Sequence, residues 1–115
     1  MKVIIAGSRQ IDDEELVHSI IEQTGLQITE VVSGNAKGVD TFGQHYAQKH
    51  GVAIVRFAPE WKRYKKAAGP IRNRQMAEYA DALIAIPDKN SKGTWDMIKK
   101  MKKLGKKVFV YTFKD

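Results

Sequence analysis

The sequence predicts an α/β fold in which helices cover both faces of a doubly wound, five-stranded parallel sheet. Short apolar runs alternate with segments of helical periodicity, which is typical of strand–helix–strand units. Five of these runs are expected to form strands, at residues 3–6, 31–32, 52–57, 82–86 and 108–111. Right-handed crossovers favour the strand order 3-2-1-4-5, which places the first and fourth strands side by side at the topological switch point.

The first strand leads into a turn with candidate ligand contacts and then into a helix. Gly7, Ser8 and Arg9 offer a bare backbone, a hydroxyl donor and a cation, which together suit a phosphate or a ribose. The alternative is a simple strand-exit turn with a surface arginine. Asp12 is expected to cap the helix that follows, with Glu15 as its capping-box partner. The buried stripe expected for this helix is Leu16, Val17, Ile20 and Ile21.

Residues 30–51 combine a strand, a glycine-bearing turn and a helix. This geometry presents backbone N–H groups to an anion at a helix N-terminus, and Gly34 and Gly38 allow a ligand to approach the backbone closely. Asp40 lies in the first helical turn, where the helix dipole favours a carboxylate. The alternative is that the glycines only make a tight turn and the carboxylate only supports the helix. The candidate ligand contacts in this stretch are Ser33, Gly34, Asn35, Ala36, Lys37, Gly38 and Asp40.

A long connection without apolar periodicity follows the third strand, from Ala58 to Gly69. Ordered loops of this length are commonly lids or binding loops. Trp61 and Tyr64 lie among four cations here, a mixture that suits base stacking combined with attraction to phosphates. The alternative is a solvated basic loop whose tryptophan covers the edge of the core.

Two further helix starts carry polar candidates. Pro70 is expected in the first turn of the next helix, where an anion is also favoured. Residues 89–94 form a second glycine-bearing turn after the fourth strand. The candidate ligand contacts in these two regions are Arg72, Asn73, Ser91, Gly93 and Thr94. The core stripe expected for the last helix is Met97, Ile98, Met101 and Leu104.

The predicted topology brings the polar turns after strands 1, 2 and 4 to one crevice, which favours ligand binding more strongly than any one turn does. The sequence has neither a Walker A motif nor a G-x-G-x-x-G fingerprint, so P-loop nucleotide hydrolysis and standard dinucleotide binding are not indicated. It has no cysteine, which excludes a disulfide scaffold and a zinc–thiolate site. His45 and His50 point to different faces of their helix, and no metal site is expected.

Composition and charge narrow the class of protein further. The 115 residues make one domain, spanning 1–115, and the formal net charge of +7 implies attraction to polyanions or anionic ligands. No apolar run approaches the roughly 20 residues needed to span a bilayer, and the N-terminal apolar stretch is too short for a signal peptide. We therefore expect a cytoplasmic protein with no membrane partner.

Four motifs occur in a fixed order along nearly the whole chain. They are Gly7-Ser8-Arg9, the turn from Ser33 to Asp40, Gly69-Pro70-x-Arg72-Asn73 and Ser91-x-Gly93-Thr94. Together they resemble the SLOG superfamily, which joins the DprA/Smf and LOG families, and most closely its small YspA/YpsA-like branch. The resemblance implies a Rossmann-like domain that binds nucleotides or nucleotide-derived ligands, and it implies self-association into a homo-oligomer.

The same resemblance shows where this chain departs from its relatives. LOG enzymes are phosphoribohydrolases of nucleoside monophosphates, with an Arg-Lys pair and a Pro-Gly-Gly-x-Gly-Thr-x-x-Glu motif. Arg72 matches the arginine, but Asn73 replaces the lysine and Met97 stands where the catalytic glutamate belongs. DprA proteins resemble the Ser33–Asp40 turn and bind single-stranded DNA, but Gln44 stands where their histidine follows the aspartate.

The sequence therefore predicts a binder of a nucleotide or nucleotide-derived small molecule, acting as a sensor or sequestering module without a cofactor. One alternative is a LOG-like hydrolase of an N-glycosidic bond, with Asp40 and Asp88 as candidate catalytic carboxylates. The missing glutamate argues against such turnover. The other alternative is a DprA-like binder of single-stranded nucleic acid, which would use Trp61 and Tyr64 for stacking.

Overall fold

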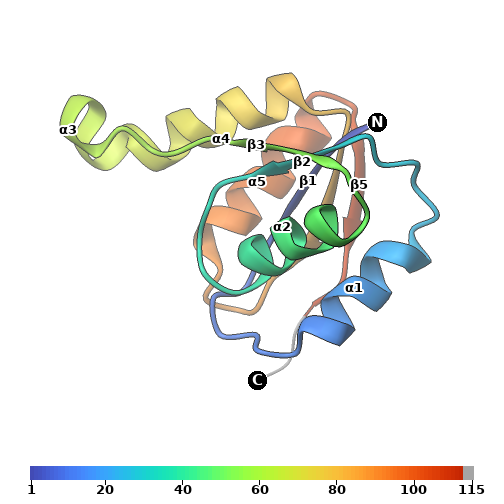
Figure 1. Ribbon diagram of the computed structural model, residues 1–115. Coiled ribbons are helices and arrows are strands. Elements are labelled where there is room, and N and C mark those ends of the chain that lie inside the picture. The colour runs from blue at the N-terminus through green and yellow to red at the C-terminus, as the bar shows by residue number, and fades with distance from the viewer. Residues whose placement is uncertain (113–115) are drawn as a thin grey trace.

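The computed structural model shows a five-stranded parallel sheet of order β3-β2-β1-β4-β5, which confirms the predicted topology (Figure 1). The structure describes residues 1–112. The strands are β1 (Lys2–Gly7), β2 (Glu30–Ser33), β3 (Ala53–Arg56), β4 (Ala82–Ile86) and β5 (Lys107–Val110). The central strand β1 pairs with β4 from Val3 to Gly7 and with β2 from Lys2 to Ile4. The carboxyl ends of these three strands therefore meet at one edge of the sheet.

Two pairs of helices cover the two faces of this sheet. The helical elements are α1 (Glu14–Gln23), α2 (Val39–Lys49), α3 (Trp61–Tyr64), the 3₁₀ turn η1 (Lys65–Ala67), α4 (Ala68–Tyr79) and α5 (Lys92–Lys103). α1 and α2 pack together on one face, and α4 and α5 pack together on the other. Among residues 1–112, no helix combines the length and the apolar character that crossing a bilayer requires.

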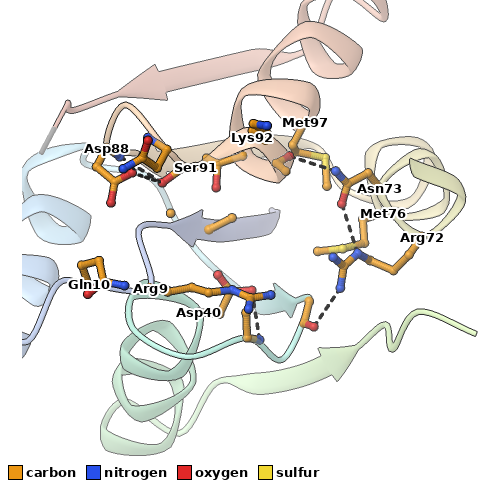
Figure 2. Close-up of a pocket in the computed structure, with 17 residues that line it drawn as sticks. Arg9, Gln10, Asp40, Arg72, Asn73, Met76, Asp88, Ser91, Lys92 and Met97 are labelled. Carbon is orange, nitrogen blue, oxygen red and sulfur yellow. Dashed lines mark hydrogen bonds between the residues drawn. The ribbon is translucent and has the colours of Figure 1, made fainter. Parts of the chain in front are cut away.

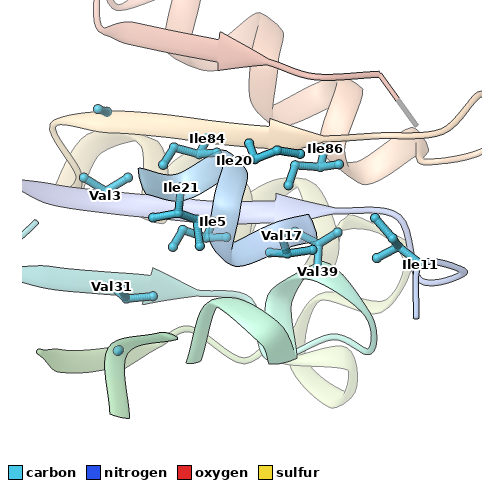
Figure 3. Close-up of a cluster of buried hydrophobic side chains, with 12 residues drawn as sticks. Val3, Ile5, Ile11, Val17, Ile20, Ile21, Val31, Val39, Ile84 and Ile86 are labelled. Atoms are coloured by element: carbon cyan, nitrogen blue, oxygen red, sulfur yellow. The ribbon is translucent and has the colours of Figure 1, made fainter. Parts of the chain in front are cut away.

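The alternation of side chains along β1 divides the core between these two faces. Val3 and Ile5 lie in the cluster under α1 and α2, which Figure 3 shows, whereas Ile4 lies in the cluster under α4 and α5. All three are fully buried, as expected of a central parallel strand. A side-chain carbon at Gly43 of α2 would come within 2.8 Å of Ile5, so a glycine is needed for α2 to lie this close to β1.

The structure corrects two details of the predicted helices. Asp13, not Asp12, caps α1, and its carboxylate accepts a hydrogen bond of 3.1 Å from the backbone N–H of Leu16. Two residues of the predicted core stripes are exposed, since Leu16 is 40% exposed and Leu104, just beyond the end of α5, is 49% exposed. Periodicity marks the face of a helix well but sets its edges and ends poorly.

The long connection predicted between Ala58 and Gly69 is largely helical. α3 and η1 occupy residues 61–67 of it, and α4 begins at Ala68, two residues before Pro70. None of the residues of α3 or η1 is buried, and α3 projects beyond the rest of the fold (Figure 1). A helix that buries no stripe needs no apolar period, so no periodicity in the sequence predicts it.

Candidate functional site

A cleft of about 580 Å³ lies beyond the carboxyl ends of β1, β2 and β4 (Figure 2). This is the topological switch point, where ligand sites of doubly wound sheets are expected. The segments after β1 and β2 contribute Ala6, Gly7, Arg9, Gln10, Gly34, Ala36 and Asp40 to its lining. α4 contributes Arg72, Asn73 and Met76, and the segment after β4 with α5 contributes Asp88, Asn90, Ser91, Lys92, Gly93, Thr94 and Met97. The three predicted turns therefore meet around one space.

Five of the predicted contact residues do not line the cleft. Ser8, Ser33, Asn35, Lys37 and Gly38 belong to this group. The Ser33 hydroxyl and the Asn35 amide oxygen both accept hydrogen bonds from Nε2 of Gln44, at 2.9 and 3.0 Å, so they hold the β2 turn onto α2. Lys37 is exposed. Gly38, at φ +73°, lies against the backbone of Ser8, whose carbonyl accepts from the N–H of Val39 at 3.2 Å.

Asp88 holds the loop after β4 and joins it to the loop after β1. Its Oδ2 accepts a 2.5 Å hydrogen bond from the Ser8 hydroxyl, and its Oδ1 accepts from the Asn90 N–H at 2.7 Å and the Ser91 hydroxyl at 3.0 Å. The backbone carbonyl of Asp88 accepts from the indole N–H of Trp95 at 3.0 Å. The hydrogen bond from Ser8 is the main cause that lowers the pKa of Asp88 below its usual value. Its carboxylate is therefore committed to structure.

Arg72 is fixed in place by the backbone around it. Its Nη1 donates to the carbonyl of Gly34 at 2.9 Å and to the carbonyl of Phe57 at 3.4 Å, and its Nε donates to Oδ1 of Asn73 at 3.1 Å. Burial lowers the pKa of Arg72, while the neighbouring Asp40 raises it. An arginine stays protonated under such a shift, so a pre-oriented cation faces the cleft.

Asp40 is a buried carboxylate between two arginines. It is 6% exposed, and burial raises its pKa from 3.8 to about 6. A 3.4 Å hydrogen bond from the Ala36 N–H and the charges of Arg72 and Arg9 oppose that rise. Figure 2 shows Arg9 extending beside Asp40, with Arg72 on the opposite side. The Asp40 carboxylate accepts fewer hydrogen bonds than the Asp88 carboxylate, so it has more acceptor capacity left for a hydroxyl or amine of a ligand.

Asn73 joins α4 to the start of α5. Its Nδ2 donates to the carbonyl of Gly93 at 2.9 Å and to the carboxylate of Asp96 at 3.0 Å. Asp96 in turn pairs with Lys100 at 2.7 Å. The amide side chain is 5% exposed and positions the glycine-bearing turn.

Sequence reasoning missed part of the lining. Gln10, Asn90 and Lys92 flank predicted contacts, and that adjacency is the only signal for them in the sequence. Met97 is a predicted core residue, and both Met97 and Met76 of α4 are buried, but they also form an apolar wall of the cleft. A helix face that lines a cleft has the same periodicity as one that packs against a sheet.

The two aromatic candidates lie away from the cleft. Trp61 is 58% exposed on α3 and lines neither the cleft nor its neighbour. Tyr64 lines a second cavity, of about 330 Å³, between the end of β3 and α4. Within residues 1–112, no three histidine or acidic side chains are grouped in a way that would hold a metal ion.

Comparisons with known proteins agree with this architecture. The model of the YspA, cpYpsA-related SLOG family matches residues 1–64, more than half of the chain. The solved structure of DNA processing protein A (DprA) from Streptococcus pneumoniae superposes with a TM-score of 0.77 at 22% sequence identity. That match covers 95% of this chain and 49% of the DprA chain, so this chain spans about half the length of that protein. No curated protein sequence matches significantly.

Proposed function

This chain belongs to the YspA, cpYpsA-related SLOG family, and from that premise we propose that its cleft binds a nucleotide or nucleotide-derived small molecule. In this proposal the protein acts as a sensor or a sequestering module. The phosphate lies against Arg72, Arg9 and the backbone of residues 34–36 and 93–94. The rest of the ligand lies along the apolar wall.

The observation that carries the proposal is the fixed guanidinium of Arg72 beside a glycine turn at a helix N-terminus. Arg72 is held on the carbonyl of Gly34 through Nη1, and its Nη2 group can pair with phosphate oxygens. The N-terminus of α5 opens onto the same space through Lys92, Gly93 and Thr94, and the helix dipole favours an anion there. Arg9 supplies a second cation on the far side of Asp40.

The apolar wall suits the uncharged part of a nucleotide. Met76 and Met97 present thioethers, which pack well against flat rings and sugars. A volume of about 580 Å³ lies within the range of ligand pockets, roughly 300–1,000 Å³. Asp40 is placed to accept a hydrogen bond from a ribose hydroxyl or a base amine.

The test compares two neighbouring arginines of α4. Arg72→Ala is expected to weaken nucleotide binding by about ten- to a hundredfold, because charge-assisted hydrogen bonds contribute roughly 1.5–3 kcal/mol. Arg74→Ala is the matched control, since Arg74 is exposed, pairs with Glu78 at 3.7 Å and does not line the cleft. Binding is measured by calorimetry over a set of nucleoside mono- and diphosphates, and native mass spectrometry of the freshly purified protein reports any retained nucleotide and the oligomeric state.

Two outcomes would contradict the proposal. One is the absence of saturable binding for every nucleotide in the set. The other is an affinity that neither Arg72→Ala nor Arg9→Ala changes, which would remove the phosphate from the assigned position. Circular dichroism of each variant separates a lost contact from a lost fold.

A second candidate function is hydrolysis of an N-glycosidic bond, and Asp40 is the observation that favours it. A pKa of about 6 suits a general acid or base near neutral pH, and the carboxylate faces the cleft. The binding proposal expects no release of free base from nucleoside monophosphates. Enzyme-like turnover that Asp40→Asn abolishes would establish the hydrolase instead.

A further inference from the structure

A second cavity lies on the other side of Arg72 from the cleft. The second cavity, of about 330 Å³, lies between the segment after β3 and the first turns of α4. Arg72 lines both spaces. Its Nη1 donates to Gly34, a wall residue of the cleft, and to Phe57, a wall residue of the second cavity. The guanidinium group therefore stands between the two spaces, with a backbone anchor on each side.

The walls of the second cavity suit a flat ring with polar edges. Tyr64 is an aromatic residue of the lining, Ile71 is an aliphatic one, and Phe57 lines the cavity while its ring packs against Tyr79. Gln75 and Glu60 lie on the same lining and can pair with ring nitrogens or exocyclic amines. Stacking on aromatic side chains is the common way in which proteins hold a nucleobase without a tight hydrogen-bond code.

The second cavity also has a positioned cation of its own. Arg56 lines it, and Nε of Arg56 donates to Oε1 of Gln44 at 2.9 Å. Gln44 is in turn held by Ser33 and Asn35 of the β2 turn. Arg56 is therefore tied to the same turn that carries Gly34. Two guanidinium groups, of Arg56 and Arg72, are fixed around one turn, as two adjacent phosphates would require.

We propose that the second cavity is a ring subsite, and that the ligand is a nucleotide derivative whose two phosphates join a nucleoside in the cleft to a second ring-bearing group beyond Arg72. This inference rests on the proposed function, because it takes the phosphate position beside Arg72 from it. A simple mononucleotide fills only one of the two spaces. A ligand with a ring on each side of a diphosphate fills both.

The experiment compares ligands that differ only in the second nucleoside. Calorimetry measures the binding of adenosine diphosphate and of P1,P2-di(adenosine) diphosphate to the wild-type protein. Guanosine diphosphate and P1,P2-di(guanosine) diphosphate are measured in the same way. The dinucleoside compounds are expected to bind at least about tenfold more tightly, the gain that stacking of one base gives. They carry less negative charge than the nucleoside diphosphates, so a gain in affinity reports the ring and not the charge.

Two aromatic residues of α3 supply the variants. Tyr64→Ala removes a ring from the second cavity and is expected to abolish the advantage of the dinucleoside ligand while leaving nucleoside diphosphate binding within about twofold of wild type. Trp61→Ala is the matched control, because Trp61 belongs to the same short helix but lines neither space. It is expected to preserve both affinities.

The outcomes distinguish a failure of the second subsite from a failure of nucleotide binding in the cleft. Equal affinity for both ligand types in the wild type, or an equal loss for both in Tyr64→Ala, would overturn the second subsite and leave nucleotide binding in the cleft intact. Saturable binding of neither type would contradict the proposed function itself, and the second subsite would fall with it.

Discussion

The buried carboxylate of Asp40 opposes folding when it is ionised. Its pKa is about 6 in the folded protein and near 3.8 when solvated, so the folded state binds the proton more tightly between these values. The stabilising effect of the protonated form is complete below about pH 3.8 and is lost as the pH rises through about 6. Asp40→Asn is therefore expected to gain stability relative to wild type from pH 4 to pH 7, by up to about 3 kcal/mol.

The measurement is urea unfolding of both proteins at pH 4 and pH 7. Asp88 provides a control in which stability depends on pH in the opposite direction. Hydrogen bonds lower its pKa, so the ionised carboxylate stabilises the fold above pH 3.8, the usual pKa of an aspartate. Asp88→Asn is expected to lose stability at pH 7, and the loss should shrink as the pH falls below that value. A pH-independent difference between Asp40→Asn and wild type would contradict the burial of an ionisable group at this position.

Replacement by alanine is expected to have different effects at two glycines of the predicted turns, Gly38 and Gly93. At Gly38, φ is +73° and an added Cβ would lie 2.2 Å from the carbonyl oxygen of Ser8, so Gly38→Ala is expected to cost more than about 2 kcal/mol of stability. At Gly93 an added Cβ meets nothing within 4 Å, so Gly93→Ala should be neutral or stabilising by up to about 1 kcal/mol.

The proposed phosphate position adds a second readout at Gly93. A methyl group there would stand where the phosphate approaches the backbone, so Gly93→Ala is expected to bind nucleotide at least about tenfold more weakly while melting no lower than wild type. Thermal melting and calorimetry on the same sample provide the two values. Unchanged affinity would remove the start of α5 from the assigned contacts.

At the scale of an element, the end of α4 depends on one lysine from a distant segment. Nζ of Lys106 donates to the carbonyls of Ala77, Glu78 and Ala80 at 2.7, 3.0 and 2.7 Å. These carbonyls have no partner within the helix, and a cation there also complements the helix dipole. Lys106→Met is expected to lower stability by about 1–2 kcal/mol in denaturant unfolding. Lys103→Met, exposed on α5, is the matched control and should change it little.

The elements differ in how much of them the sequence could predict. β1 and β4 are continuous apolar runs, and runs of this kind in an alternating chain leave few arrangements of the sheet. α3 buries nothing, so no apolar period marked it. The cap of Lys106 on α4 joins residues almost thirty positions apart, and such a contact has no local signature.

For the molecule as a whole, one group of cations lies outside the cleft, on the projecting segment formed by α3 and η1. Lys62, Arg63, Lys65 and Lys66 are exposed there and lie outside the cleft lining. A small ligand that meets one or two cations in the cleft should show a log–log salt slope near −1, whereas a nucleic-acid strand that also engages α3 should show a slope of about −4.

We expect the shallow slope. The measurement is a titration of mononucleotides and a labelled single-stranded oligonucleotide at three salt concentrations, on wild type and a Lys65→Gln, Lys66→Gln double variant. Submicromolar binding of the oligonucleotide with a steep slope that the double variant reduces, together with no saturable mononucleotide binding, would favour the strand binder over the small-ligand protein.

The sequence could predict where the candidate site lies, but not which of its residues stabilise the loops and which can face a ligand. The strand order alone places the turns after β1, β2 and β4 at the carboxyl edge of the sheet, and the cleft lies there. The sequence does not show that the Asp88 carboxylate accepts hydrogen bonds from Ser8 and Ser91, or that the Asp40 carboxylate keeps more acceptor capacity. Nor could it place Tyr64 beside a second cavity, because that depends on the direction in which α3 leaves the sheet.

The hydrogen bond from Trp95 to the carbonyl of Asp88 gives the protein a built-in optical probe. The chain has two tryptophans, and the other, Trp61, is largely exposed on α3. The indole of Trp95 is bonded to the loop that forms one rim of the cleft, so its emission responds to a change in that loop's polarity or packing. A Trp61→Phe protein would therefore carry a single tryptophan, at the cleft, and ligand titrations could be followed by its intrinsic fluorescence without a label.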